Sequence, residues 1–260
     1  MNDVQERPVA ARGLVPHPPL TRYYADESER RRWLRGMFDR TALDYDRIEW
    51  LMTLGTGVSY RREALERAGL QHGMRTLDVG SGTGLTAVAA EAIVGGSERL
   101  LRIDPSLGML TSGRADGNNT AIAGCAEALP VASARWDFVS MGFALRHVAD
   151  LGAAFAEFHR VLRPGGRVCV LEITRPDSPI GRRLLKLYMR RWVPFLATMV
   201  GRTSDLPGLM RYYWDSTEAS VPPAAVVAAL RDAGFAEARR NLHMGIFSEY
   251  SATKAALPTP

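Results

Sequence analysis

The segment 77–84 places three glycines at every second position, between an apolar run and a helical pattern: Gly80, Gly82 and Gly84. Glycines let a backbone turn tightly and let a ligand approach the main chain. The dinucleotide fingerprint needs its third glycine one position later, where this chain has Leu85. Asp78 precedes the glycines, and its carboxylate would repel a pyrophosphate but attract an ammonium group. The loop therefore favours S-adenosyl-L-methionine (SAM), which carries an ammonium and a sulfonium; a tight turn without a ligand is the alternative.

A second acidic residue, Asp104, ends the next apolar run, about one helix and one strand after Asp78. In a doubly wound fold, an acidic side chain at this place accepts hydrogen bonds from both ribose hydroxyls. Asp104 could instead cap the helix expected after Pro105, and the two roles are compatible. We therefore expect Asp104 to bind the ribose of SAM.

One of the five histidines lies where ligands bind such a sheet. His147 follows the fourth expected strand, and we expect it to act as a general base or to orient a methyl acceptor. A loop histidine bonded to the backbone is the alternative. His243 is a second candidate for the base. The remaining three are expected to be solvated: His17, His72 and His159.

Arg146 precedes His147 and could stabilise a phenolate or enolate on the acceptor. Its structural alternative is an ion pair, for which Asp150 is the expected partner. No group of cysteine, histidine and carboxylate side chains has the spacing of metal ligands, so no metal site is expected.

Alternating apolar runs and helical stretches predict the elements that position these groups. The runs cover 74–79, 99–103, 120–124, 137–143 and 167–173. This alternation predicts an α/β fold with a doubly wound, mostly parallel, seven-stranded sheet, with N-terminal helices and a helical cap insertion. Two closing strands near 237–242 and 246–253 are expected to form an antiparallel edge, after a helix at about 222–233.

The same patterns divide the chain into five parts. We expect a mobile tail over 1–25, an N-terminal helical segment over 26–70 and a SAM-binding core over 71–178. A helical cap insertion follows over 179–217, and the C-terminal helix and closing strands occupy 218–260.

The expected cap combines an apolar face with a basic stripe. The apolar residues recur at steps of three and four, and Pro194 is expected to kink or end their helix: Leu185, Tyr188, Trp192, Phe195 and Met199. The basic residues are Arg182, Lys186 and Arg190, with Arg183 and Arg191 beside them. Such a stripe is either a solvated surface or a contact with a membrane surface or an anionic substrate.

Composition bounds the class of protein. The chain has 260 residues, a formal net charge of +5 and 46% hydrophobic residues, enough for a substantial core. No apolar run is long enough to cross a membrane, and the first residues lack the apolar stretch of a secretory signal. Two cysteines argue against a disulfide scaffold and favour a reducing cytoplasm. The scattered charge argues against a nucleic-acid partner.

Together these segments resemble a class I SAM-dependent methyltransferase, and more narrowly the ubiquinone/menaquinone-biosynthesis C-methyltransferase family. The resemblance runs from about residue 37 to residue 254. Besides the glycine loop, it rests on the segments 38–55, 126–130, 143–146, 160–173 and 211–216. The departures concern mainly the acceptor side, where His147 and Glu49 replace asparagines and Tyr250 replaces a histidine; Cys125 replaces a polar residue beside the adenine.

The resemblance implies the residues that hold SAM: Tyr45, Asp78, Gly80, Ser81, Gly82, Gly84, Asp104, Pro105, Met109, Cys125, Ala126, Glu127 and Phe143. Tyr45 would form a lid over SAM, and Glu127 would lie beside the adenine. A core aromatic and a loop carboxylate are the alternatives at these two positions.

The leading hypothesis is SAM-dependent methyl transfer to a hydrophobic small molecule, with C-methylation of a quinol-like, aromatic or isoprenoid acceptor as its specific form. One alternative is an O-, N- or C-methyltransferase of specialised metabolism with another acceptor. Another is a SAM-binding cyclase or assembly partner that does not methylate. We expect a cytoplasmic protein; peripheral contact with the inner membrane face and homo-oligomer formation are left open.

Overall fold

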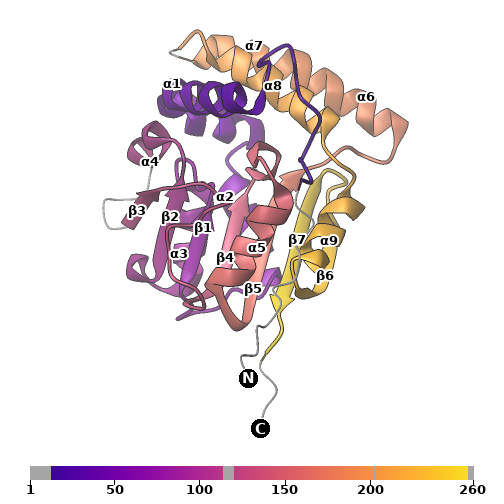
Figure 1. The fold of residues 1–260 in the computed structure, drawn as a ribbon. Coiled ribbons are helices and arrows are strands. Elements are labelled where there is room, and N and C mark those ends of the chain that lie inside the picture. Colours follow the sequence, from indigo (N-terminus) through magenta and orange to yellow (C-terminus); the bar gives the residue numbers. More distant parts are fainter. Residues whose placement is uncertain (1–12, 114–119, 202, 257–260) are drawn as a thin grey trace.

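A computed structural model describes residues 13–113, 120–201 and 203–256 of the chain. Its strands are β1 (Thr76–Val79), β2 (Leu100–Asp104), β3 (Thr120–Ala123), β4 (Trp136–Gly142), β5 (Leu162–Ile173), β6 (Phe235–His243) and β7 (Phe247–Lys254). Within the described residues they form one seven-stranded sheet in the order β3-β2-β1-β4-β5-β7-β6 (Figure 1). Strands β1 to β5 run parallel, and β7 runs antiparallel to β5 and β6. The predicted mostly parallel sheet and its antiparallel closing strands are confirmed.

The helices are α1 (Glu27–Thr53), α2 (Gly57–Arg67), α3 (Leu85–Val94), α4 (Leu107–Ser112), α5 (Leu151–Val161), α6 (Pro179–Leu187), α7 (Val193–Val200), α8 (Leu206–Ala219) and α9 (Pro223–Asp232). Short turns of 3₁₀ helix, η1 (Ser97–Arg99) and η2 (Leu145–His147), and a π-helical turn, η3 (Tyr188–Trp192), complete the chain order. None of these helices, in the ranges described, is long and apolar enough to cross a bilayer.

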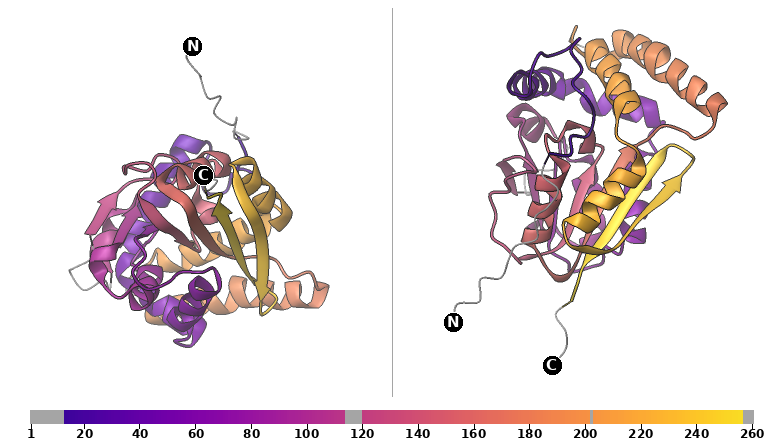
Figure 2. Two further views of the ribbon diagram at one scale, coloured as in Figure 1. Left: turned by 90° about the horizontal axis from the view of Figure 1, so that it is seen from below. Right: turned by 45° about the vertical axis from the view of Figure 1, so that its right-hand side comes forward.

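The sheet is buried on both faces, and a separate layer of helices lies across one of its ends (Figures 1 and 2). Helices α5 and α9 pack on one face, with Phe155 and Phe158 fully buried against strand residues such as Val139. Helices α2 and α3 cover the other face, where Phe138 and Cys169 are buried. Each buried phenylalanine contributes about 1.5–3 kcal/mol of transfer free energy, so these contacts hold the strand ends in place.

Helix α1 belongs to the layer across the sheet end, together with α7 and α8. Asp26 caps α1 by accepting a hydrogen bond from the Glu29 N–H at 2.8 Å. The helix ends where Leu54 adopts a left-handed backbone conformation, and α2 begins at Gly57. The expected helices within 26–70 are therefore present as two, separated by a short turn.

Residues 13–25 differ from the mobile tail that we expected over 1–25; residues 1–12 lie outside the described residues. Leu14 and Pro16 offer their carbonyl oxygens to the N–H groups of Leu151 and Val221, at 2.9 and 2.8 Å. These donors lie at or just before the starts of α5 and α9, where helical N–H groups lack partners within their own helix. His17, expected to be solvated, is 4% exposed. The segment is thus a strap packed on the domain and held by these hydrogen bonds. Its sequence has no apolar period, so it gives no sign of such distant partners.

The cap insertion also departs from its expected pattern. Pro194 lies at the start of α7, just after the π-helical turn η3, so the helix changes its winding there. Of the expected apolar face, Leu185 and Tyr188 are half-buried, whereas the later residues face outward: Trp192, Phe195 and Met199. The buried side after the turn consists of Met189, Val193 and Ala197.

Candidate active site

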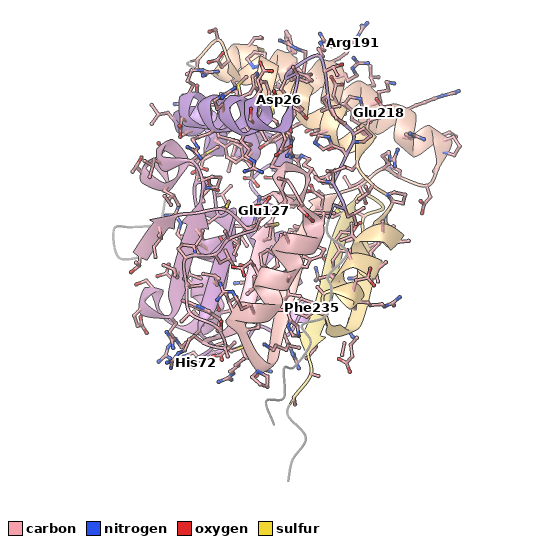
Figure 3. The ribbon with its side chains drawn as sticks, in the orientation of Figure 1. Asp26, His72, Glu127, Arg191, Glu218 and Phe235 are labelled. Carbon is pink, nitrogen blue, oxygen red and sulfur yellow. The ribbon has the colours of Figure 1, made fainter. Side chains whose placement is uncertain are left out.

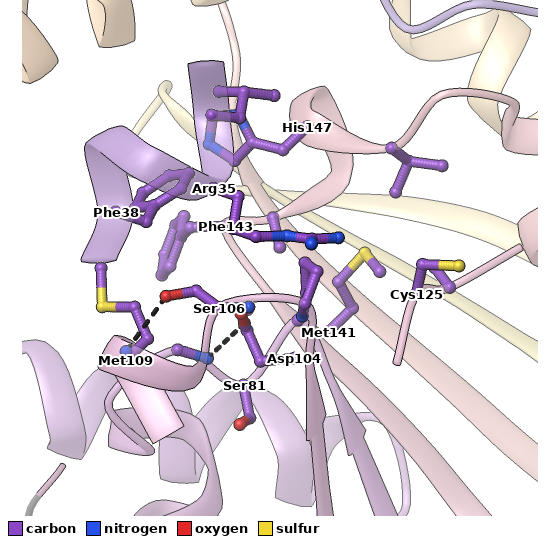
Figure 4. A pocket seen from close by; sticks show the side chains of 18 of the residues that line it. Arg35, Phe38, Ser81, Asp104, Ser106, Met109, Cys125, Met141, Phe143 and His147 are labelled. Carbon is purple, nitrogen blue, oxygen red and sulfur yellow. Dashed lines mark hydrogen bonds between the residues drawn. The ribbon is translucent and has the colours of Figure 1, made fainter. Parts of the chain in front are cut away.

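A pocket of about 270 Å³ lies between α1, the loops that follow β1, β2 and β4, and Tyr213 of α8. Ligands of doubly wound sheets bind at this carboxyl edge of the strands. Figure 4 shows Ser81 and Asp104 at one end of the pocket, His147 at the other, and the Arg35 side chain between them. The pocket therefore joins a polar end on the sheet to an end roofed by the helical layer.

The glycine loop forms the floor of the polar end. The N–H groups of Gly80 and Ser81 donate to the Ile103 carbonyl at 2.8 and 3.1 Å, which folds the loop back over β2. A Cβ at Gly80 would lie 2.6 Å from the Ala144 side chain, so this glycine is required for packing. Among the described residues, a Cβ at Gly82 would meet no atom within 4 Å, because it would point into open space. The loop thus leaves room for a ligand at Gly82.

Asp104 lies in the wall at the polar end of the pocket, and it is not the cap of α4 that its position before Pro105 suggested. Its oxygens accept hydrogen bonds from the N–H groups of Gly82 and Ser106, each at 2.8 Å. Ser106, and not Asp104, caps α4 by accepting from the Met109 N–H at 3.1 Å. Burial raises the pKa of Asp104 to about 6. Each carboxylate oxygen keeps a second lone pair, so the side chain could still accept ribose hydroxyls.

Asp78 lies beneath the loop and is fully buried, outside the pocket wall. The Ser140 hydroxyl donates to its Oδ1 at 2.6 Å, while Oδ2 has no hydrogen-bond partner within the described residues. Burial raises the pKa of Asp78 to about 7. An unpaired, buried carboxylate oxygen suits a cationic partner. This oxygen and the open space at Gly82 fit the ammonium and sulfonium of SAM.

The structure gathers most of the predicted site residues around the pocket: Tyr45, Gly80, Ser81, Gly82, Asp104, Pro105, Met109, Cys125, Ala126, Glu127, Phe143 and His147. Four others lie outside its wall: Asp78, Gly84, Arg146 and His243. Gly84 caps α3 with a positive φ of 96° and packs against Arg102, so its place in the loop is structural.

Phe143 follows β4 with a positive φ of 60°, a conformation that is strained for a bulky residue. Its N–H donates to the Leu171 carbonyl at 2.7 Å, which holds the strained turn. Its ring lies 4.8 Å from the Arg61 guanidinium carbon. The turn directs an aromatic ring to the pocket wall, where Figure 4 shows it.

His147 forms part of the roof of the pocket. Its ring stacks on Tyr212 and Tyr213 at centroid distances of 5.7 and 5.8 Å, and lies edge-on to Phe38 at 5.2 Å. Nδ1 lies 3.4 Å from the Tyr212 hydroxyl, and Nε2 has no partner among the described residues. Burial, together with the positive charges of Arg146 and Arg30, lowers the pKa of His147 well below 6.5. The ring is therefore neutral at pH 7, with one nitrogen unused.

Arg146 has a different partner from the one we expected. Its guanidinium makes a buried ion pair with Glu172, and Asp150 instead caps α5 through the Ala153 N–H. The guanidinium carbon lies 4.4 Å from the centre of the Tyr213 ring. Since Tyr213 lines the pocket and Arg146 does not, Arg146 supports the wall from behind.

His243 is not brought to the pocket, so the structure does not support it as the base. It lies at the end of β6, with its ring 5.4 Å from that of Tyr60. Tyr60 in turn lies 6.4 Å from Phe143. A run of aromatic rings therefore separates His243 from the space that a substrate could occupy.

Arginines on α1 and α2 that we did not single out also line the pocket. Arg31 lies 3.3 Å from Glu27, and Arg61 lies 2.5 Å from Glu49. Arg35 is exposed and has no ion-pair partner in the described parts of the chain. The only sign in the sequence that Arg35 could belong to a site is its position one helical turn after Arg31. Two arginines four residues apart on a helix are usually both solvated, so this sign is weak.

Comparisons with known proteins identify the family. The sequence pattern of the ubiE/COQ5 methyltransferase family matches residues 25–254. A demethylmenaquinone methyltransferase of Mycolicibacterium vanbaalenii is 34% identical over 220 residues, covering 84% of this chain and 93% of that protein. A ubiquinone/menaquinone biosynthesis C-methyltransferase of Hahella chejuensis is 30% identical, with coverages of 84% and 90%.

Solved structures share the fold at lower identity. A SAM-dependent methyltransferase of Thermotoga maritima, described as a possible histamine N-methyltransferase, has a TM-score of 0.59 at 21% identity, covering 85% of this chain and 99% of its own. A phosphoethanolamine N-methyltransferase of Haemonchus contortus, solved with S-adenosylhomocysteine, has a TM-score of 0.60 at 15% identity, with coverages of 85% and 60%. These two likenesses concern the fold alone.

Proposed function

Because this chain belongs to the ubiE/COQ5 methyltransferase family and is a SAM-dependent methyltransferase, we propose that it methylates a ring carbon of a hydrophobic, quinol-like molecule. The chain covers most of the length of two relatives, and these are named for demethylmenaquinone and for ubiquinone/menaquinone biosynthesis. The observation that carries the proposal is the pairing of a polar pocket end at Asp104 with an aromatic end at His147 (Figure 4).

At the polar end, the chain would bind SAM through main-chain and carboxylate groups. Asp104 would accept the ribose hydroxyls, and the buried carboxylate of Asp78 would attract the ammonium from beneath the loop. The segment of Cys125, Ala126 and Glu127 forms a side wall of the pocket, against which the adenine would pack. When bound, SAM supplies a methyl group on a positively charged sulfur, which is an excellent leaving group, so the protein mainly has to orient the acceptor.

At the aromatic end, His147 is the general base. With its proton on Nδ1, facing the Tyr212 hydroxyl oxygen, the buried Nε2 keeps a lone pair that would take the acceptor's phenolic proton. Removing that proton increases the electron density on the ring carbon that is methylated. Phe38 and Tyr213 flank the histidine and favour a flat aromatic acceptor.

A second acceptor class is favoured by Arg35. Its guanidinium lies in the pocket wall with no acidic partner in the described ranges, and Arg31 lies one turn away. A carboxylate or phosphate on the acceptor would pair with it. This observation supports the alternative of a specialised acceptor that carries an acidic group.

The experiment that separates these possibilities uses purified protein, methyl-labelled SAM and a panel of acceptors, analysed by mass spectrometry. The panel contains a short-chain demethylmenaquinol, neutral phenols, phenolic acids and isoprenyl diphosphates. Transfer to the quinol supports the main proposal. Transfer only to the acids or diphosphates, lost in Arg35→Gln, would replace it with the second acceptor class. SAM binding with no transfer to any acceptor would contradict both.

A further inference from the structure

A row of large apolar side chains faces outward along the helix formed by α6, η3 and α7. Six of them are 48–72% exposed: Ile180, Leu184, Leu187, Trp192, Phe195 and Met199. Single exposed apolar residues are ordinary on protein surfaces, but a continuous row on one helix marks an interaction surface. We call this row the outer apolar face.

The π-helical turn places both halves of this face on one side. The residues before the turn are spaced by four and three, and those after it by three and four, but Leu187 and Trp192 are five residues apart. Around an α-helix, five residues amount to about 500°, which would turn Trp192 about 140° away from Leu187. In η3 the Val193 N–H instead bonds to the Tyr188 carbonyl, five residues back. This wider turn brings residues five apart into line.

The inner side of the same helix is already anchored. Met189, Val193 and Ala197 are at most 2% exposed, in the core that α1 and α8 also form. The helix thus packs on the rest of the described chain through its inner side, and the outer apolar face stays exposed. Figure 2 shows this helix running past the edge of the sheet, at the outer side of the helical layer.

Five cationic residues lie on the helix beside the outer apolar face: Arg182, Arg183, Lys186, Arg190 and Arg191. No aspartate or glutamate occurs between residues 179 and 200. Lys186 lies 3.3 Å from Glu218, whereas the four arginines have no ion pair in the described part of the chain. Figure 3 shows Arg191 at the outer edge of the helical layer, far from His72 at the opposite end of the molecule.

We propose that this helix docks on the surface of an anionic lipid bilayer, with the outer apolar face in the headgroup region and the arginines on lipid phosphates. Cationic, amphipathic helices with tryptophan, phenylalanine and leucine bind such interfaces. A second copy of the chain is a poorer occupant, because pairing the face with itself would oppose two sets of five positive charges. The docking itself is argued from the helix alone, and only its purpose rests on the proposed function. A bilayer would hold a hydrophobic quinol-like acceptor next to the helical layer that roofs the pocket.

The test is co-sedimentation of the full chain with vesicles of phosphatidylcholine alone or mixed with phosphatidylglycerol, at low and high salt. We expect binding to the anionic vesicles that weakens at high salt. Two variants report on the face: Leu184→Gln/Phe195→Gln removes apolar area on both sides of η3, and Arg182→Gln/Arg183→Gln/Arg190→Gln/Arg191→Gln removes charge. Each should weaken partitioning about tenfold or more.

Control variants change exposed residues elsewhere, Leu43→Gln/Met244→Gln and Arg62→Gln/Arg135→Gln, and should bind as the native chain does. Methyl transfer to a water-soluble acceptor is measured in parallel and should be unchanged in every variant, so loss of docking and loss of catalysis are read separately. No binding to anionic vesicles at low salt would overturn the proposal. So would equal binding by native chain and face variants, or a dimer in sedimentation velocity that only the apolar variant dissociates.

Discussion

The Tyr212 hydroxyl lies 3.4 Å from His147 Nδ1, and the two rings stack at a centroid distance of 5.7 Å. This contact uses one nitrogen of the imidazole and leaves Nε2 without a partner among the described residues. Arg30 fixes the same turn from α1 by donating to the carbonyls of Arg146 and Val148, each at 3.1 Å. The histidine is thus held by its surroundings while its reactive nitrogen stays unused.

Substituting His147 should affect catalysis far more than cofactor binding. His147→Ala should lower kcat by about 10²- to 10⁴-fold, the usual contribution of a general base. The dissociation constant for SAM should change less than twofold, because His147 lies at the other end of the pocket from Asp104. Steady-state kinetics and isothermal titration calorimetry measure the two effects; an unchanged kcat would remove His147 as the base.

The pH dependence of His147 supplies a second readout. Its pKa is lowered, so the acid limb of kcat/KM for the acceptor, measured at saturating SAM, should fall below pH 6.5, where protonation removes the Nε2 lone pair. Tyr212→Phe removes the hydroxyl that orients Nδ1, and should lower kcat and displace this limb without changing SAM affinity. A profile that is identical in Tyr212→Phe would mean that the contact plays no part in catalysis.

Asp104→Ala should weaken SAM about tenfold to a hundredfold, because charged hydrogen bonds to the ribose are worth about 1.5–3 kcal/mol. Part of the loss reflects the loop, since Asp104 also accepts from the N–H groups of Gly82 and Ser106. Asp104→Asn keeps the shape and one acceptor, and should retain more affinity than the alanine variant. A SAM dissociation constant within twofold of the native value in Asp104→Ala would contradict the ribose assignment.

Asp78 should make SAM binding depend on pH. Its pKa is raised to about 7, so half of the free protein is protonated there, and a cationic ligand binds only the ionised form well. Affinity should therefore fall as the pH drops below 7, and binding at pH 7 should release protons, which calorimetry in buffers of different ionisation enthalpy detects. Asp78→Asn should bind SAM weakly at all pH values and lose the proton release near pH 7. A remaining change in SAM affinity near pH 6 is assigned to Asp104, whose pKa is about 6.

The stability of the free protein should show the opposite sign. Because the folded-state pKa of Asp78 lies above its ordinary 3.8, ionisation is harder in the folded state than in the unfolded chain. This group therefore destabilises the fold progressively as the pH rises from 4 to beyond 7. The Tm of Asp78→Asn should fall less than that of the native chain as the pH rises over this range. Parallel plots of Tm against pH for the two proteins would contradict the claim that burial raises the pKa of Asp78.

Two glycines of the loop should respond differently to alanine. Gly80→Ala meets the Ala144 side chain at 2.6 Å and should destabilise the fold, visible as a lower Tm. Gly82→Ala meets no atom of the described residues within 4 Å, so it should fold at a cost of about 1–2 kcal/mol for its positive φ but lose SAM affinity. Equal SAM affinity in Gly82→Ala and the native chain would mean that the open space beside Gly82 is not occupied by the cofactor.

The elements that position the cofactor end could be predicted from the sequence, because their signals are local. Glycine spacing fixed the loop, apolar runs marked the parallel strands, and Asp104 followed from its place at the end of a strand. The seven-stranded sheet and the gathering of most predicted residues at one pocket follow from these signals.

What the sequence missed depends on tertiary contacts or on irregular winding. The strap at 13–25 is ordered by hydrogen bonds to helix starts more than a hundred residues away. The partner of Arg146 is Glu172 on the neighbouring strand, which chain proximity to Asp150 could not reveal. The π-helical turn changes which residues of the cap face outward, and a prediction from a strict α-helical period cannot include it.

The measurement that tests the central claim most directly is the position of the methyl group in the product. Native enzyme, ¹³C-methyl-labelled SAM and a short-chain demethylmenaquinol are incubated together, and the product is isolated and examined by NMR. The account predicts one labelled methyl on a ring carbon for each S-adenosylhomocysteine formed, and no such product from His147→Ala in the same time. A label on oxygen, or no labelled quinol despite bound SAM, would contradict it.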